Sequence, residues 1–339
     1  MSIYDIHFCS RKELSILQKF IDKFWKKDHI LSYSKELFEF QHLRDGQEHY
    51  TFVIATNTLT EEIDGVFGYI ESQKYDETNT IPNIGWGAVW KVRDDINNKE
   101  IGKLGLKMLK FLIKNSPIET FASLGISKTH KDIALSLNFI VNELNHYYII
   151  NNCVNDYKIA QNPHRSKPNI KKDKAYISVT NDITNINIES NLNRFKNVSY
   201  FVNRYQRHPF FQYEFWVVKN DQNPLLIFAV RRIFVGDSNI YRIVDMIGNL
   251  PSTVSLLDEI QRIIQLGNAE YVDCLNYGIS PEFFKINGFE QVPFDNSTVI
   301  PEHLDPLEHK YIPLEFECMD DVNVVIFKGD GDQDRPNKI

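Results

Sequence analysis

The chain has 339 residues, of which 42% are hydrophobic and 24% charged, and its formal net charge is −7. This negative balance argues against nucleic-acid binding, because neutralising phosphates needs an excess of Lys and Arg on one face. No run of roughly 18 apolar residues occurs, and the N-terminal MSIYDIHFCSRKE lacks the apolar core of a signal peptide, so we expect a cytoplasmic protein without a membrane segment.

The first half of the chain predicts a mixed α/β domain. Strands of alternating or continuous apolar residues are followed by helices in which apolar residues recur every three or four positions. In chain order we expect a strand at 4–9, helices at 12–25 and 34–42, strands at 51–55, 65–71 and up to 92, a helix ending at 114, a strand at 121–126, a helix at 131–139 and a closing strand at 147–150.

The second half repeats this order after a polar stretch. Residues 151–197 read as a linker with one strand, AYISV. Strands are then expected at 212–218, 225–235, 240–247 and 271–278, helices at 254–266 and 281–286, and a last strand after Gly288-Phe289. An internal repeat of roughly 150 residues explains this pattern. We therefore predict two domains, residues 1–152 and 198–339, joined by a linker at 153–197.

The segment 84–114 carries the clearest functional signal. A strand leads through a polar loop with Gly102 and Gly105 into a helix with apolar residues at Leu104, Met108, Leu109, Leu112 and Ile113. The first turn of a helix has N–H groups without intrahelical partners, and glycines let a phosphate approach them. The order of elements predicts a diphosphate site. A glycine pair at a helix start also commonly marks only a turn or loop in the backbone. No GxxxxGK[ST] or GxGxxG motif occurs.

These features resemble the GNAT superfamily of CoA-dependent N-acyltransferases, present twice. In that family a Q/R-x-x-G-x-G/A loop at a helix start binds the CoA pyrophosphate, and a later helix ends in Gly-Phe. Asn138-Phe139 and Gly288-Phe289 stand at the Gly-Phe position of the two halves, whereas no single register of the loop motif fits 99–105 completely. Pro251 and the lack of a second glycine disfavour the second half. The resemblance implies acyl-CoA binding in the first half, by Trp90, Lys91, Val92, Gly102, Lys103, Leu104 and Gly105.

A finer resemblance covers nearly the whole chain. The runs FWKKDHILSYSKELFEFQH, GWGAVWKV, ELNHYYIINN and GDGDQDRPN are similar to bacterial tandem-GNAT proteins encoded with surface-polysaccharide pathways. This resemblance implies transfer of an acyl group, from acetyl-CoA or 3-hydroxybutyryl-CoA, to the amine of a nucleotide-linked amino-deoxy sugar, typically a dTDP sugar, by direct attack in a ternary complex. An amino acid or peptide amine as acceptor, or a non-catalytic CoA-binding scaffold, remains an alternative.

The catalytic role has one candidate. Many superfamily members use a Tyr four residues before the Gly-Phe glycine, but Ala134 and Phe284 stand there. We predict that His146, at the start of the closing strand, acts as the acid or base, because histidine is the side chain most used for proton transfer near neutral pH. The alternative is a hydrogen-bonded structural histidine.

The acceptor site is predicted from aromatic, polar and basic side chains of both halves. An indole can pack its face on a sugar ring, and polar side chains can bond the sugar hydroxyls. The planar guanidinium of arginine can donate two hydrogen bonds to a diphosphate. The alternatives are core packing and solvated strand faces. The candidates are Trp25, His29, Gln41, Trp86 and Tyr148 for the sugar or acyl group, and Arg204, Arg207 and Arg231 for the diphosphate.

We predict no metal site. Asp330, Asp332 and Asp334 imitate the opening of a calcium loop, but Arg335 stands at its sixth position and the chain ends at Ile339. The four cysteines lack CxxC spacing and are expected to be reduced.

Overall fold

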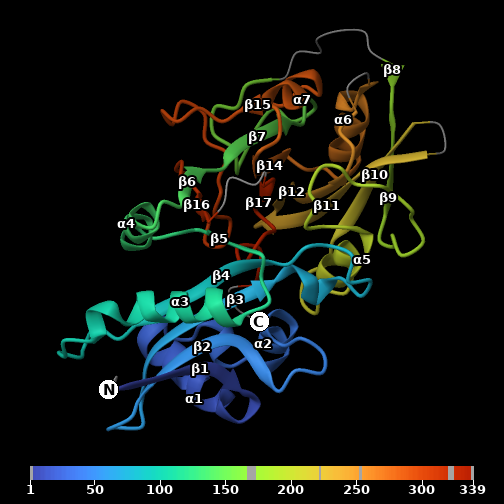
Figure 1. Cartoon of the computed structure of the whole chain (residues 1–339). Helices are drawn as coiled ribbons and strands as arrows, with labels where there is room; N and C mark the ends of the chain where they lie inside the picture. Colours follow the sequence, from blue (N-terminus) through green and yellow to red (C-terminus); the bar gives the residue numbers. More distant parts are fainter. Residues whose placement is uncertain (1–2, 166–172, 221–222, 252–253, 320–323, 337–339) are drawn as a thin grey trace.

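A computed structural model describes residues 3–165, 173–220, 223–251, 254–319 and 324–336. Within them the chain forms two mostly antiparallel sheets with helices packed against them, which confirms the predicted α/β class (Figure 1). The first sheet runs in the order β1 (Tyr4–Ser10), β2 (His49–Asn57), β3 (Ile63–Glu71), β4 (Ile84–Val92), β5 (Thr120–Leu124), β16 (Glu315–Cys318) and β6 (Ile140–Glu143).

The second sheet has the same plan. Its order is β15 (Glu290–Gln291), β7 (Asn145–Ile150), β14 (Tyr271–Tyr277), β12 (Ser238–Gly248), β11 (Asn223–Val235), β10 (Glu214–Asn220) and β9 (Tyr176–Thr180), with β17 (Ile326–Phe327) paired to β14. A separate pair is formed by β8 (Asp173–Lys174) and β13 (Val254–Ser255). The linker strand predicted at AYISV is β9.

Most helices lie close to their predicted positions, and one further short helix forms at Val198–Phe201, where none was predicted. The helices are α1 (Leu14–Phe20), α2 (Lys35–His42), α3 (Leu104–Asn115), α4 (Lys128–Ser136), α5 (Val198–Phe201), α6 (Leu257–Leu266) and α7 (Pro281–Ile286). Single 3₁₀ or π turns occupy Arg11–Glu13, Ile21–Trp25, Ile30–Ser32, Ser72–Tyr75, Ile101–Lys103 and Val202–Gln206. In the described part of the chain, no helix combines the length and the apolar character that a membrane crossing requires.

The two sheets exchange one strand each. The expected closing strand of the first half forms as β7, but it pairs with β14 and β15 of the second sheet. In return β16, from near the C-terminus, lies between β5 and β6 of the first sheet. The sheets therefore do not follow the two halves of the sequence strand by strand, and residues from the end of the chain reach the first sheet.

The internal repeat is visible in both pairing and helix ends. β4 and β5 are parallel neighbours in the first sheet, and β12 and β14 are parallel neighbours in the second. Each following helix ends at a residue with positive φ, Asn138 (60°) and Gly288 (77°). Asn tolerates the left-handed conformation that Gly adopts freely, so Asn138 replaces the glycine of the motif.

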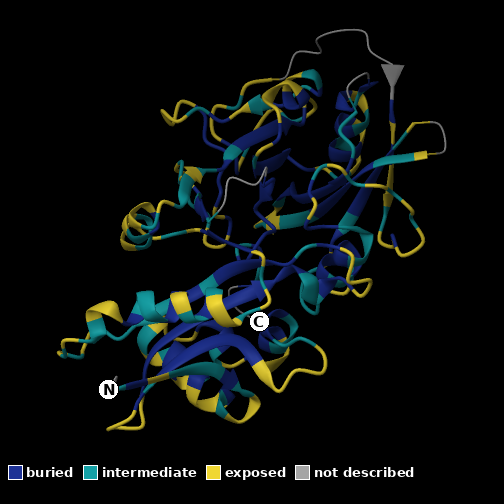
Figure 2. Cartoon of the chain, in the orientation of Figure 1, coloured by how far each residue is buried: buried dark blue, intermediate teal, exposed yellow. Residues whose placement is uncertain are grey.

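Side-chain alternation on β2 explains why helices cover both faces of the first sheet. Tyr50, Phe52 and Ile54 pack in one cluster with α1 and α2. Val53 and Ala55 point the other way and pack with α3. Both faces of the central strands are thus buried, and the exposed positions lie on the outer sides of the helices (Figure 2).

A third cluster joins the two sheets, and the C-terminal segment 326–336 crosses it. Trp86 and Ala122 of the first sheet pack with Val244 of the second and with Ile326. Ion pairs also hold the segment. Lys196 Nζ lies 2.7 Å from Asp245 Oδ1 and 2.8 Å from Asp330 Oδ1. This interior position lets the segment supply side chains to cavities between the halves.

Two histidines, the buried His29 and the partly buried His208, make stability depend on pH. Nδ1 of His208 accepts the N–H of Phe211 at 2.9 Å, and Nδ1 of His29 accepts that of Leu31 at 3.3 Å, which requires neutral rings. Burial lowers the pKa of each from 6.5 to about 3. Only the unfolded state gains these protons below pH 6.5, so the free energy of unfolding falls as the pH falls, by about 1.4 kcal/mol per pH unit for each histidine.

We expect His208→Asn, which keeps an acceptor without the titration, to reduce that slope by about 1.4 kcal/mol per pH unit between pH 6 and 4. Urea unfolding at a series of pH values measures it. Equal slopes for the variant and the original protein would show that His208 does not contribute.

Candidate functional site

The site begins where two parallel strands separate. β4 and β5 pair from Ile84 with Thr120 up to Gly87 with Ser123, and no further. Beyond this point β4 pairs only with β3, and the other side of β5 pairs with β16. On the side of β4 that faces β5, the main-chain N–H and C=O groups after Gly87 are therefore left for a ligand or for water.

A cavity of about 860 Å³ occupies this separation, and we call it the splay cavity. β4, the start of α3, the β5–α4 loop and α4 form its walls, together with one aromatic side chain of the N-terminal helical region and the C-terminal segment. Its lining includes Trp25, Gly87, Ala88, Trp90, Lys91, Val92, Arg93, Gly102, Lys103, Gly105, Ser123, Gly125, Ser127, Thr129, His130, Asp332, Gln333 and Arg335.

The start of α3 faces the splay cavity without a side-chain cap. A Cβ on Gly102 would have nothing within 4 Å, so the space before the helix is open. A Cβ on Gly105 would lie 3.1 Å from Trp90 Nε1, so this glycine serves the close packing of α3 on the indole. The two glycines thus have different roles. The N–H of Leu104 bonds the carbonyl of Ile101 in the preceding turn, and the positive end of the helix dipole favours an anion at this position.

A polar cluster lies at the point of separation. His130 Nε2 is 2.6 Å from Glu317 Oε1, and Ser123 Oγ donates to the same oxygen at 3.1 Å. Glu317 is 1% exposed, and the ring of His130 meets Trp90 edge-on with centroids 4.7 Å apart. Ser127 caps α4 by accepting the N–H of His130, which fixes this histidine in the first helical turn. The cluster holds a histidine, oriented by a buried carboxylate, at the cavity wall.

The C-terminal segment closes the other side. Gln333 Nε2 donates to the carbonyl of Leu124 at 3.0 Å, and Arg335 Nε donates to Asp332 Oδ2 at 3.2 Å. These contacts place amide and guanidinium groups beside the β5–α4 loop.

Solved structures with the same fold include two from bacteria. A GCN5-related N-acetyltransferase from Anabaena variabilis is 8% identical, with a TM-score of 0.54 over 94% of this chain and 74% of the other. A protein from Enterococcus faecalis, described as a probable N-acyltransferase, is 8% identical, with a TM-score of 0.55 over 94% of this chain and 72% of the other. The chain has the GNAT fold. No protein-family model and no curated protein matches the sequence.

Within this GNAT fold, six of the seven residues predicted to bind CoA line the splay cavity: Trp90, Lys91, Val92, Gly102, Lys103 and Gly105. The seventh, Leu104, is fully buried in the core under α3. Trp90 also stacks on Phe67, with centroids 4.6 Å apart, so the indole forms a rigid wall.

The structure does not bring His146 to the splay cavity. His146 lies on β7 in the second sheet, and its Nε2 is 3.0 Å from Asp273 Oδ2. Asp273 also binds the guanidinium of Arg242, which together with His146 holds the pKa of this carboxyl below its ordinary value against the effect of burial. This buried network corresponds to the structural alternative for His146.

The predicted sugar-binding residues are also separated. Trp25 is 41% exposed and lines the splay cavity. His29 is buried at a turn, and Gln41 is fully buried with no hydrogen-bond partner for its amide among the described residues. Trp86 packs between the sheets, and Tyr148 lies in the core of the second half, where its hydroxyl accepts the N–H of His164.

The three predicted phosphate-binding arginines occupy three different environments. Arg204 is buried and donates to the carbonyls of Gly329 and Gly331 and to Tyr75. Arg207 is exposed and pairs with Glu77. Arg231 lines a second cavity, which we call the basic cavity and which also contains Lys26, Phe210, Phe211, Arg232, Phe234, Arg242, Glu302, His303, Leu304, Asp305, Pro306, Glu308, Lys328, Asp332, Gln333 and Arg335.

The sequence interpretation missed His130, Glu317, Ser123, Gln333 and Arg335 as site residues. One signal was available, because Ser127 marks a helix start directly after a strand and puts His130 in its first turn. Among the described residues, no group of three or more His, Cys, Asp or Glu side chains is arranged to hold a metal ion.

Proposed function

We propose that the protein is an N-acyltransferase that moves an acyl group from acyl-CoA, bound in the splay cavity, to the amine of a nucleotide-linked amino-deoxy sugar. The observation that supports the donor most directly is the separation of β4 and β5 after Gly87, opposite the uncapped start of α3. The acceptor class rests on the resemblance of the sequence runs given above, and acetyl or 3-hydroxybutyryl is the acyl group that it implies.

The residues present suit such a donor. Helix-start amides near Gly102, with Lys91 and Lys103 in the same wall, suit a diphosphate. Main-chain groups of β4 beyond Gly87 suit the amides of an extended pantetheine arm, which pairs with them as a strand would.

The reaction needs a neutral amine, a polarised thioester carbonyl and a proton for the thiolate. The amine nitrogen attacks the carbonyl carbon, so that an N–C bond forms and the C–S bond breaks. The nitrogen, which becomes positively charged in the attack, loses a proton, and the thiolate sulfur gains a proton. We assign the amine's proton to His130, with Glu317 stabilising the imidazolium that forms. Holding both reactants in one geometry supplies much of the remaining rate enhancement.

A thiol-release assay tests the function. Acetyl-CoA and 3-hydroxybutyryl-CoA are each supplied with dTDP-amino sugars or with amino acids, and free CoA thiol is measured. Release only with the sugars supports the proposal, whereas release only with amino acids replaces the acceptor. CoA binding without release for any amine would favour a non-catalytic, CoA-binding role.

Gly102 provides a separate test of the donor site. Gly102→Trp fills the open space before α3, and we expect CoA to bind roughly 10- to 100-fold more weakly, because charge-assisted hydrogen bonds to the diphosphate are lost. Isothermal titration calorimetry with CoA measures this. Leu59→Trp is the control for a new exposed indole, since Leu59 is 79% exposed and lines neither cavity. Unchanged affinity in Gly102→Trp would move the CoA site elsewhere.

A further inference from the structure

The basic cavity, with a volume of about 1020 Å³, adjoins the splay cavity. The two share Asp332, Gln333 and Arg335 of the C-terminal segment. Lys26 comes from the first half of the chain, while residues 210–212, β11, β12, the 302–308 segment and Lys328 also line the wall. A molecule in the basic cavity can therefore reach the splay cavity along a shared wall.

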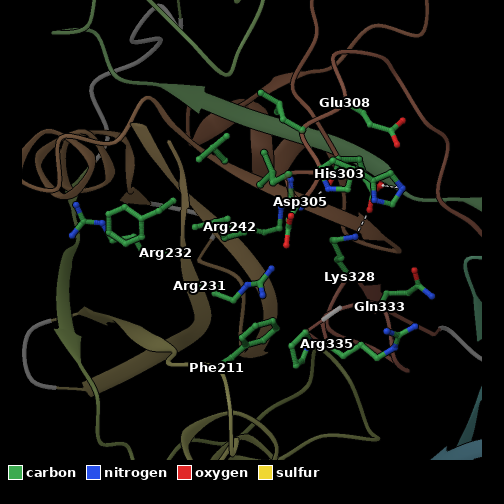
Figure 3. A pocket seen from close by; sticks show the side chains of 18 of the residues that line it. Phe211, Arg231, Arg232, Arg242, His303, Asp305, Glu308, Lys328, Gln333 and Arg335 are labelled. Atoms are coloured by element: carbon green, nitrogen blue, oxygen red, sulfur yellow. Dashed lines mark hydrogen bonds and ion pairs between the residues drawn. The ribbon is translucent and has the colours of Figure 1, made fainter. Parts of the chain in front are cut away.

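The basic cavity collects positive charge in an acidic protein. Six lysine or arginine side chains and four carboxylates line it, although the whole chain carries a net charge of −7. Figure 3 shows Arg231, Arg242, Lys328 and Arg335 around one open space. Such a concentration of fixed cations favours an anionic ligand.

The cations are held in place before any ligand binds. Arg242 is fixed by Asp273 and by the carbonyls of Pro301 and Glu302, at 2.8 Å each. Lys328 pairs with Glu302. Their side chains are 2% and 7% exposed and already paired, so they contribute fixed charge beside the cavity and not free donors.

Arg231 and Arg335 have bonding capacity left. Arg231 lies 4.0 Å above the ring of Phe211 and pairs with Asp334 at 2.9 Å, yet its Nε has no partner among the described residues. Arg335 donates through Nε to Asp332, at 3.2 Å. Their side chains are 17% and 18% exposed, so each guanidinium still reaches the cavity. Two planar guanidinium groups that face the same cavity match the geometry of a diphosphate.

Apolar surface lies beside the charges. Phe234 is 66% exposed, with Arg232 over its ring at 5.0 Å, and Leu304 and Pro306 also line the cavity. A flat heterocycle next to a diphosphate fits such a combination, because its face stacks on aromatic rings and guanidinium planes.

We propose that the basic cavity binds a nucleoside diphosphate group, with Arg231 and Arg335 as its phosphate ligands. This assignment rests on the proposed acyl transfer, in which that group carries the acceptor amine to the shared wall at 332–335. It separates the two substrates, one in each cavity, and gives the C-terminal segment a contact with both.

Calorimetry on the full chain tests the assignment, with dTDP, UDP, pyrophosphate, thymidine and CoA as separate probes. We expect a nucleoside diphosphate to bind, pyrophosphate to bind more weakly, and thymidine to show no binding. Arg231→Gln should weaken nucleoside diphosphate binding by about ten-fold or more and leave CoA binding unchanged. Arg262→Gln is the control, since Arg262 is exposed, pairs with Glu259 and lines neither cavity.

The outcomes separate this assignment from the proposed function. CoA binding without any nucleoside diphosphate binding overturns the assignment and leaves the acyltransferase intact. Competition between the nucleoside diphosphate and CoA also overturns it, because both would then occupy the splay cavity. Nucleoside diphosphate binding that depends on Arg231, without CoA binding, supports the assignment and refutes the donor site. If Arg231→Gln does not fold, Arg335→Gln and Arg231→Lys replace it, and unchanged affinity in both overturns the assignment.

Discussion

His130→Ala is expected to lower kcat for acyl transfer by about 10²- to 10⁴-fold and to leave the Kd for CoA nearly unchanged. His130 is the histidine at the wall of the splay cavity, with Nε2 2.6 Å from the buried carboxylate of Glu317. Alanine removes the proton acceptor, but it leaves the helix start at Gly102 and the main chain of β4 in place. Steady-state kinetics together with CoA titration separate these two effects.

Two further variants sharpen this prediction. Glu317→Gln keeps a hydrogen-bond acceptor but removes the charge that stabilises the imidazolium, so we expect an intermediate loss of kcat and a changed pH profile. Asp132→Ala, on the same helix, is the control and should keep wild-type kinetics, since Asp132 is exposed and does not line the splay cavity. His146→Ala should lower the free energy of unfolding and have little effect on kcat, because His146 bonds Asp273 inside the second sheet. A large kcat loss in His146→Ala with none in His130→Ala would reverse the assignment.

Local sequence was sufficient to predict most elements, including the start of α3. The glycines before α3 and the apolar spacing from Leu104 to Leu112 determine where the helix begins and which face it buries. Each depends on neighbours within a few residues, as does the left-handed helix end at Asn138. Such features can be predicted because the interactions that fix them are local.

Local sequence does not determine which strands pair with each other. β7 and β16 have apolar patterns that fit either sheet, and only the complete fold determines that each joins the sheet of the other half. Glu317 meets Ser123 across 194 positions of sequence, and no spacing rule indicates that distance. The same exchange carries His146 away from the site where its place in the sequence suggested it belonged.

The acidic C-terminal segment shows how one pattern fits two structures. Asp330, Asp332 and Asp334 alternate as calcium ligands do, but the structure gives each a different protein partner. Asp330 binds Lys196, Asp332 binds Arg335, and Asp334 accepts the hydroxyl of Tyr213 at 2.7 Å and pairs with Arg231. These contacts fasten the segment between the halves and so position Gln333 and Arg335 at both cavities.

Lys196→Met is expected to lower the free energy of unfolding by about 3–5 kcal/mol. Lys196 is 2% exposed in its side chain, and it neutralises the buried carboxylates of Asp245 and Asp330. Burial alone would lower the pKa of Lys196, but these two carboxylates raise it above its ordinary value. Methionine fills a similar volume but leaves two adjacent negative charges without a counterion. Urea unfolding at neutral pH measures the difference.

Arg194→Met is the matched control for this change. Arg194 is exposed two residues away, and its guanidinium stacks on Phe195, so we expect the free energy of unfolding to fall by less than about 0.5 kcal/mol.

Adding Asp330→Asn to Lys196→Met should recover part of the stability, because one of the two unpaired charges disappears. Recovery of stability without recovery of acyl transfer would show that the Lys196–Asp330 pair also positions Gln333 and Arg335. Equal stability of Lys196→Met and the original protein would mean that apolar packing alone holds the C-terminal segment.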